Sequence, residues 1–361
     1  NFLGTGNTVG IGINKNIYSE MYNLSFMNPY ATKDGVSLGY NVYFRETDYG
    51  EFNVANYLTN SNGFGAQFGY PTSDITRLGF NVTYDKTDID VGTLPALEIY
   101  DFVSAEGNIF ETLSVQFSWQ RVTLNRGLFP TAGSSTVISL STTVPGSDLS
   151  YYRSSIRQRY YRPLSSNFVF GFSGELGYLD AYGETEETPF FQNFYAGGPR
   201  SLRGFESNTL GPRSTDAPCY EFNYEEKTCP NLIDTDGDGE LDSPYINPYA
   251  NSTSRYRDRP IGGNIKVEGS MQLIFKLPFI EDQRSLRSAF FFDFGNVFSD
   301  NCKDYQINCY KPALEDLRYS YGVGVTWITG FGPLSLAISK PTNAGPQERT
   351  EEFQFTVGNV F

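Results

Sequence analysis

The sequence predicts an all-β chain that folds as an antiparallel transmembrane β-barrel. Three features of its 361 residues support this prediction. Many segments of about ten residues alternate apolar and polar positions, the polar positions are mostly Gly, Ser, Thr, Asn and Gln, and short turns alternate with long loops. No apolar run approaches the ~20 residues that a membrane helix needs, so a helical membrane protein is excluded.

The alternation has a period of two and is clearest between residues 167 and 178. Phe168, Phe170 and Phe172 fall on one face, and Gly171 and Ser173 on the other, because successive strand residues point to opposite sides. The second face carries few charges, unlike the solvent face of a soluble β-sandwich, which is the alternative fold. Since lipid cannot hydrogen-bond a backbone, a sheet that spans a membrane has to close.

In chain order, this pattern predicts about fourteen strands. They lie near residues 8–14, 21–27, 36–44, 63–70, 77–84, 111–121, 134–143, 151–161, 167–178, 264–277, 286–297, 318–328, 333–340 and 352–360.

The connections between these strands form two sets. The short set is at 70–74, 162–166 and 329–333, and the longer, more polar set is at 45–62, 85–110, 179–263, 298–317 and 341–351. This asymmetry is typical of outer-membrane barrels, with short periplasmic turns and long extracellular loops. Residues 99–107 are expected to form a short surface helix. Loop 179–263 is far longer than ordinary connections, and its Phe, Tyr, Pro and Gly content favours an ordered, functional loop.

Composition excludes several classes of function. The formal charge is −14, which argues against broad nucleic-acid binding because that needs a cationic surface. The chain has no His, so Ser-His-Asp and Cys-His catalysis are impossible and the commonest zinc ligand is absent. We therefore expect no enzyme. No signal peptide precedes Asn1, and we expect a fragment of a longer mature protein.

The four cysteines form two close pairs, Cys219 with Cys229 and Cys302 with Cys309. Neither pair has zinc-finger spacing, and local disulfides in an oxidising compartment fit better. Both pairs fall in the long loops.

An acidic stretch resembles the start of a calcium-binding loop. Asp234, Asp236 and Asp238 stand at positions one, three and five, but Tyr245 replaces the Glu expected at position twelve. A Ca²⁺ site that also uses Asp242 is one interpretation, and a solvated acidic loop tip is the other. We expect no further cofactor.

Loop 179–263 contains Gly197-Gly198-Pro199, a tight turn, followed by the motif Leu202-Arg203-Gly204-Phe205. Arg203 is a permanently charged, planar donor that can fix a loop to a carboxylate. A solvated loop arginine is the alternative interpretation.

This motif resembles the sixth-loop segment of the outer-membrane assembly and secretion barrels, the superfamily that contains BamA and TamA. Further matches occur over nearly the whole chain, and together they resemble the BamA family of outer-membrane assembly insertases. These matches are at residues 28–30, 127–131, 144–148, 292–297, 332–334 and 353–359.

The resemblance implies a sixteen-stranded barrel preceded by soluble POTRA domains. Residues 1–361 would form one barrel domain that begins after the second strand, so the POTRA domains and two strands would be absent. Loop 179–263 would fold into the lumen, where Arg203 would pair with carboxylates of the inner wall. Asp293 matches one family partner. The second partner aligns with Gln272, which is not acidic, and Glu268 on the same face is the alternative. Cys219 and Cys229 match a family disulfide in spacing.

The last predicted strand points Phe353, Phe355, Val357 and Phe361 to one side, and Gly358 interrupts it near its end. Gly weakens strand order and permits a kink. In the family, the corresponding glycine leaves the seam between the first and last strands weakly paired.

The resemblance implies an insertase of the bacterial outer membrane that acts through this seam without bond chemistry. A nascent outer-membrane protein would add a strand to the edge at 352–360. The implied partners are nascent β-barrel proteins, accessory Bam lipoproteins bound through the POTRA domains, and the lipid bilayer. The alternatives are a TamA-like or two-partner secretion transporter, a diffusion porin and a barrel enzyme.

Overall fold

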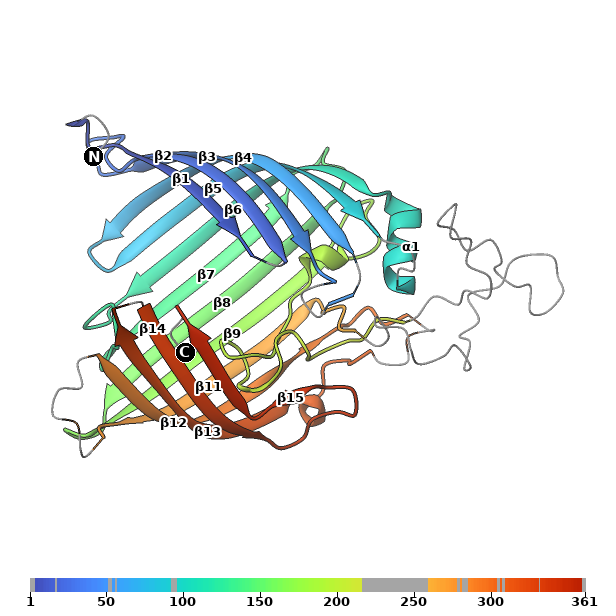
Figure 1. Ribbon diagram of the computed structural model, residues 1–361. Helices are drawn as coiled ribbons and strands as arrows, with labels where there is room; N and C mark the ends of the chain where they lie inside the picture. The colour runs from blue at the N-terminus through green and yellow to red at the C-terminus, as the bar shows by residue number, and fades with distance from the viewer. Residues whose placement is uncertain are drawn as a thin grey trace.

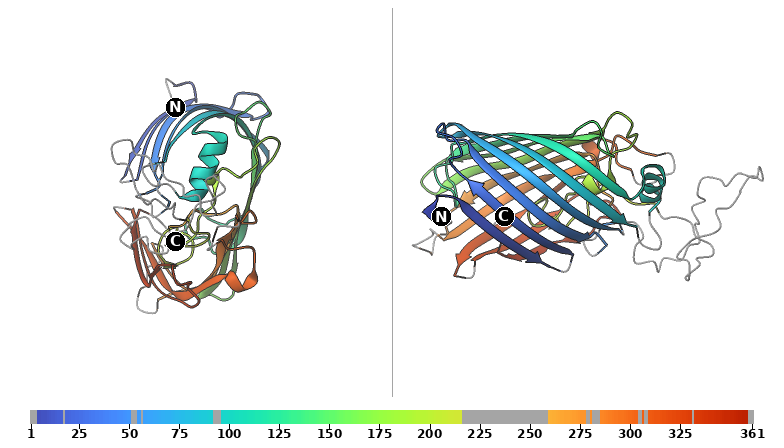
Figure 2. Two further views of the ribbon diagram at one scale, coloured as in Figure 1. Left: turned by 90° about the vertical axis from the view of Figure 1, so that its right-hand side faces the viewer. Right: turned by 90° about the horizontal axis from the view of Figure 1, so that it is seen from above.

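The structure is a computed structural model of the chain. It describes residues 4–16, 18–50, 54–55, 57–91, 96–215, 259–277, 280, 285–303, 306, 309–330 and 332–358. Fourteen strands form one antiparallel sheet that curves around a central space (Figures 1 and 2). The all-β antiparallel fold predicted from the sequence is confirmed.

The strands of this sheet pair in chain order, from β1 at one edge to β16 at the other. They are β1 (Thr8–Lys15), β2 (Ser19–Asn28), β3 (Ser37–Asp48), β4 (Leu58–Ser73), β5 (Thr76–Asp90), β6 (Ile109–Val122), β7 (Gly133–Thr143), β8 (Tyr151–Pro163), β9 (Phe168–Ala181), β11 (Ile265–Phe275), β12 (Leu286–Phe298), β13 (Arg318–Thr329), β14 (Gly332–Pro341) and β16 (Phe353–Val357). Among the described residues, β1 and β16 do not pair with each other, so this sheet is not closed.

The two faces of the sheet differ as the period of two predicts. Phe168 and Leu176 on β9 are 44% and 53% exposed on the outer face. Ser173 and Glu175 face the inside and lie beside Ser270 and Glu268 of β11. A soluble β-sandwich would bury the apolar face between two stacked sheets. That alternative is wrong, because one curved sheet carries its apolar side chains outward.

Strands β4 and β5 are longer than predicted. Strands were expected at 63–70 and 77–84, with loops at 45–62 and 85–110, but β4 begins at Leu58 and β5 continues to Asp90. Backbone pairing continues here although the outward positions are polar, as at Asn60 and Asp88. The apolar alternation used for prediction ends before the ladder does. The turn expected at 70–74 is correspondingly reduced to two residues between the strands.

A second, two-stranded sheet was not predicted. It pairs β10 (Gly204–Phe205) with β15 (Thr350–Glu351). Two short 3₁₀-helices, η2 (Phe190–Gln192) and η3 (Leu314–Asp316), lie in the long connections. No helix in the described part of the chain is long and apolar enough to cross a membrane.

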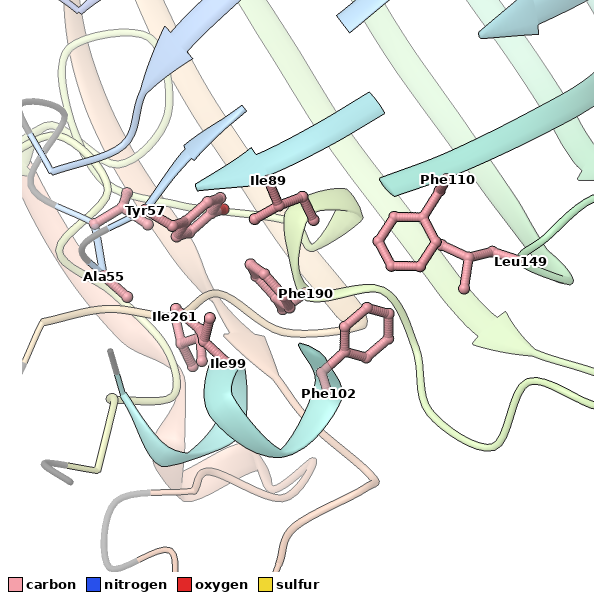
Figure 3. Close-up of a cluster of buried hydrophobic side chains, with 10 residues drawn as sticks. Ala55, Tyr57, Ile89, Ile99, Phe102, Phe110, Leu149, Phe190 and Ile261 are labelled. Atoms are coloured by element: carbon pink, nitrogen blue, oxygen red, sulfur yellow. The ribbon is translucent and has the colours of Figure 1, made fainter. Parts of the chain in front are cut away.

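A cap of buried side chains lies at the end of the sheet where the long connections meet (Figure 3). Helix α1 (Leu97–Glu106) contributes Ile99 and Phe102, which pack with Tyr57 and Phe190. The helix begins two residues before the expected range of 99–107. It is packed into the cap by its apolar face, so the expectation of a surface helix needs this correction.

Glu98 joins this cap to two other segments. Its carboxylate accepts hydrogen bonds from the Thr215 backbone N–H at 3.1 Å and from Gln306 Nε2 at 3.0 Å. Burial raises the pKa of the Glu98 carboxyl above its ordinary value. The folded cap therefore favours the protonated acid, and this contribution to stability is lost as the pH rises through the raised pKa.

The outward direction of the apolar face can be tested on strand β7. Ile138 is 39% exposed on the outer face, and its neighbour Ser139 faces inward. Ile138→Arg should lower the free energy of unfolding in lipid vesicles by about 2–4 kcal/mol, because the charge enters hydrocarbon. The matched variant Ser139→Arg should cost clearly less, since its charge remains in the lumen. Equal costs in urea titrations of the two variants would contradict this orientation.

Candidate functional site

Residues 190–215, called the inner loop here, lie against the inner face of the sheet. Phe194 pairs with Gly263, and Ala196 pairs with Leu210, through isolated backbone bridges. Leu202 is fully buried in a cluster formed with residues of β9 and β12. The described part of the predicted loop 179–263 is therefore ordered by backbone pairing and apolar packing.

Glycine is required where this loop turns. Gly197 has φ of +104°, and a Cβ at this position would stand 2.5 Å from the Glu206 carbonyl oxygen. Gly204 has φ of +92°, and a Cβ there would lie 3.1 Å from Ser339 Oγ on β14. Side chains rarely adopt such backbone angles. The glycines of the Gly197-Gly198 turn and the Leu202-Arg203-Gly204-Phe205 motif thus allow the loop to approach the wall closely.

Arg203 and Asp293 form a buried ion pair between the inner loop and β12. Arg203 Nε donates to Asp293 Oδ2 at 2.7 Å, and Arg203 Nη2 donates to Asp293 Oδ1 at 2.7 Å. The Arg203 backbone N–H also donates to Oδ2 at 3.2 Å. The side chains are only 5% and 0% exposed. This is the bidentate geometry in which guanidinium and carboxylate bind most strongly.

Two further groups complete the surroundings of the guanidinium. Arg203 Nη2 donates to Ser270 Oγ on β11 at 3.0 Å. The centre of the guanidinium lies 3.4 Å from the centroid of the Phe291 ring. Sequence reasoning did not identify either residue, although both share the inward parity of Asp293. Further hydrogen bonds offset part of the cost of burying a charge pair, and Ser270 supplies one of them.

The other predicted partners of Arg203 contact other side chains. Glu268 lies 2.8 Å from Lys266 Nζ on the same strand. Gln272 Nε2 lies 3.4 Å from Ser270 Oγ, the group that accepts from Arg203. Of the three candidates, the structure brings Asp293 into the bidentate contact.

The inner loop also contacts the last strand through Gln354, a residue that sequence reasoning missed. Gln354 Nε2 donates to the Phe205 carbonyl oxygen at 2.8 Å, and Gln354 Oε1 accepts from the Gly204 N–H at 3.3 Å. The side chain is 1% exposed. Its amide therefore pairs with the loop backbone as a neighbouring strand would. The available sequence signal was parity, which places Gln354 on the inner face between Phe353 and Phe355.

The residues predicted to form the seam lie on and directly after β16, the last strand of the sheet. Phe353, Phe355 and Val357 point outward on β16 and are each more than half exposed. Gly358 follows with φ of +82°, a left-handed conformation that ends the strand. Phe361 lies outside the described residues.

The cysteine and calcium predictions have different outcomes. A disulfide joins Cys302 and Cys309, with a Cα–Cα distance of 5.8 Å. Cys219 and Cys229 lie outside the described residues, as do the four calcium candidates Asp234, Asp236, Asp238 and Asp242. Within the described ranges, no three His, Cys, Asp or Glu side chains form a group that could hold a metal ion.

Sequence comparisons give consistent relatives. The Omp85 superfamily domain matches residues 1–361. The outer membrane protein assembly factor BamA of Neisseria meningitidis serogroup B is 29% identical over 387 residues, which cover 100% of this chain and 44% of that protein. The sorting and assembly machinery component 50 homolog of Mus musculus is 22% identical over 330 residues, with 90% and 60% coverage. The chain thus spans about half the length of these curated relatives.

Solved structures agree with the fold. The crystal structure of BamA from Haemophilus ducreyi lacking POTRA domains 1–3 has a TM-score of 0.80 and 29% identity, and the match covers 100% of this chain and 65% of that chain. CdiB from Escherichia coli has a TM-score of 0.50 at 10% identity over 93% of this chain and 52% of its own, a likeness of fold alone. The predicted BamA-type fold is confirmed.

The ion pair can be tested by substituting each partner. Arg203→Ala should lower the free energy of unfolding by about 3–5 kcal/mol, because it leaves the buried Asp293 carboxylate without a counter-charge. Arg203→Lys should recover only part of this loss, since an ammonium cannot form the bidentate contact. Urea titration in detergent micelles, with protease protection of the inner loop, measures both effects.

Two comparisons make this test specific. Arg200→Ala removes an exposed arginine three residues away and should cost less than about 0.5 kcal/mol. In a double-mutant cycle with Asp293→Ala, the combined loss should be well below the sum of the single losses. Strict additivity would mean that the two charges are not coupled.

Gln354→Leu tests the contact between the inner loop and β16. The variant keeps the side-chain volume but leaves the buried Gly204 N–H and Phe205 carbonyl without this partner, at about 1–3 kcal/mol for each unsatisfied group. Hydrogen exchange should become faster at residues 203–206 and 353–357. The control Gln116→Leu removes a lumen-facing amide of β6 that accepts from Asn81 Nδ2 at 3.0 Å. It should leave exchange in both segments unchanged, and equal effects would refute the contact.

Proposed function

The chain belongs to the Omp85 superfamily, and from this membership we propose that it is the barrel of an outer-membrane protein insertase. Barrels of this superfamily are integral outer-membrane proteins. The insertase would assemble β-barrel proteins and insert them into the bacterial outer membrane. The observation that carries the proposal is the short ladder between β14 and the last strand, β16, next to an inner loop that Arg203 fixes to β12.

Insertion into a membrane is limited by the hydrogen-bonding groups of the incoming backbone. An incoming strand must satisfy its N–H and C=O groups before it enters hydrocarbon, where each unpaired group costs several kcal/mol. An exposed sheet edge offers the required partners. In this mechanism, a nascent strand adds to β16 by β-augmentation, and no covalent bond forms or breaks. We accordingly propose that the chain is not an enzyme.

The dimensions of β16 suit this role. Within the described residues, it pairs with β14 over five residue pairs, from Leu334 with Val357 to Ile338 with Phe353. Strands β5 and β6 in the middle of the sheet pair over thirteen. A short ladder opens more readily than a long one, because fewer hydrogen bonds hold it. Gly358, directly after β16, donates its N–H to the Pro333 carbonyl oxygen at 2.7 Å. We propose that its glycine backbone allows the strand to bend once this bond opens.

The inner loop would brace the wall against this movement. Its ion pair lies on β12, and its neighbouring contact with Gln354 lies on β16. The same motif therefore touches both the firmly paired wall and the edge strand. We propose that it sets the position of β16 while substrate strands add.

The proposed partners are nascent outer-membrane β-barrel proteins, the lipid bilayer and accessory lipoproteins. A short apolar band beside the seam would thin the bilayer and lower the barrier to insertion. Accessory lipoproteins would bind through soluble POTRA domains of the kind that the resemblance implies. The long loops, with the Cys302–Cys309 disulfide, would lie on the extracellular side.

A diffusion porin or a secretion transporter of the same superfamily is the alternative. A porin needs an open lumen, whereas the inner loop and the cap of α1 occupy this one. A TamA-like or two-partner secretion transporter would share the Arg203 motif. Transport of a substrate across the membrane, rather than its insertion, distinguishes these functions from the one proposed.

The decisive experiment places a photo-crosslinking residue at Phe355 in the full-length protein and supplies a nascent β-barrel substrate. Crosslinks should form with the substrate's terminal strand and should disappear when Arg203→Ala is added, together with a loss of substrate assembly. The control places the crosslinker at Leu176, an equally exposed position far from the seam. Normal assembly by the Arg203→Ala protein with altered solute flux would favour a porin instead.

A further inference from the structure

A cavity of about 450 Å³ lies between the inner-loop tip and the turn that joins β6 to β7. Strands β8, β9, β11 and β12 form its wall. Arg157 and Arg159 from β8, Arg287 from β12 and Arg200 from the loop tip line it. These four cationic side chains converge in the lumen of a chain whose formal charge is −14.

One of these arginines already has a carboxylate partner. Arg157 Nε donates to Glu175 Oε1 at 2.9 Å. Glu175 also accepts from Lys266 Nζ at 3.3 Å, and Lys266 lies 2.8 Å from Glu268. The two glutamates on this wall are thus engaged by Arg157 and Lys266. They do not neutralise the remaining arginines.

Arg159, Arg200 and Arg287 form no ion pair anywhere in the described ranges. Arg159 and Arg200 are exposed to the cavity. The Arg287 guanidinium stacks on Tyr161 at 5.0 Å and lies 5.9 Å from Phe129, while its Nη2 is buried without a hydrogen-bond partner. Arg159 lies two residues before Tyr161 on the same face of β8. Because the Arg287 guanidinium stacks on Tyr161, the guanidinium groups of Arg159 and Arg287 lie on the same side of the cavity.

We propose that this cavity binds an acidic, extended peptide segment through its carboxylates. Guanidinium groups recognise carboxylate and phosphate in the same forked geometry. Carboxylate is favoured here because the neighbouring guanidiniums of Arg157 and Arg203 both bind carboxylates. The apolar lining comes mainly from Leu128, Phe129 and Pro130 of the turn, whereas the strand walls contribute polar groups such as Ser270 and Gln272. The volume admits a short segment and not a folded domain.

This binding site goes beyond the proposed insertion at the seam and does not depend on it. The cavity lies on the short-turn side of Arg203, whereas insertion would use the outer edge of β16. An acidic peptide could therefore bind to a chain that fails to insert substrates, and the reverse is equally possible. The two proposals are tested separately.

The test measures binding of a fluorescein-labelled eight-residue peptide that contains four glutamates to the chain in detergent micelles, by fluorescence anisotropy. The same peptide with glutamines is the ligand control. We expect binding of the glutamate peptide only, weakening with salt. Arg159→Gln/Arg200→Gln should weaken it about tenfold or more, because charge-assisted hydrogen bonds are lost. Both side chains are exposed and unpaired, so this variant should fold normally.

The matched protein control is Arg121→Gln/Arg162→Gln. It removes two charges from the outer face at the same end of the sheet, and it should bind the peptide like the unaltered chain. Arg287→Gln should also weaken binding. Equal affinity of the two double variants would overturn the proposal. Displacement by inorganic phosphate or inositol hexakisphosphate, without measurable binding of the glutamate peptide, would overturn it in favour of a phosphate site.

Discussion

The buried pair of Arg203 and Asp293 is the interaction on which the arrangement of the lumen depends. Neither charge is tolerable alone in this position, because desolvation of an unpaired ion costs several kcal/mol. The pair is favourable only while Ser270, the Phe291 ring and the Arg203 backbone N–H surround it. These partners come from β11, β12 and the loop itself. A correctly paired wall is thus a condition for the inner loop to dock, and the docked loop in turn stabilises that wall.

This dependence extends to the edge of the sheet. Gly204 and Phe205, directly after Arg203, hydrogen-bond to Gln354 on β16, and they also pair with β15 just before that strand. Within the described residues, the last strand is consequently held by five residue pairs along its ladder, by backbone hydrogen bonds at both ends and by one side chain from the lumen. Since the amide contact is made from inside, it does not occupy the outer edge of β16. Under the proposed function, an incoming strand would therefore add at that edge without breaking this contact.

Much of this arrangement could be predicted because lipid and water impose a period of two on each strand. The same alternation placed Asp293 on the inner face of its strand. The motif around Arg203 was expected to reach this carboxylate. The predicted strand ends were wrong where the outward residues are polar, as at Asn60 and Asp88. Backbone pairing continues there without the apolar alternation on which the prediction depended. Gln354 was missed for a related reason. Gln116 and Gln272 face the lumen in the same way, and only the tertiary position of Phe205 distinguishes Gln354 from them.

Charge in the lumen illustrates the same limit and explains a departure from the family pattern. Parity alone places Arg157, Arg159 and Glu175 on one face, but it does not reveal which arginine has the carboxylate. In the structure, Arg157 takes Glu175, and Lys266 takes Glu268. Gln272 stands where the resemblance implies a second acidic partner for Arg203, and its neutral amide lines the cavity of unpaired arginines. Arg203 forms an ion pair with Asp293, and the neutral Gln272 adds no negative charge to the cavity that contains Arg159, Arg200 and Arg287.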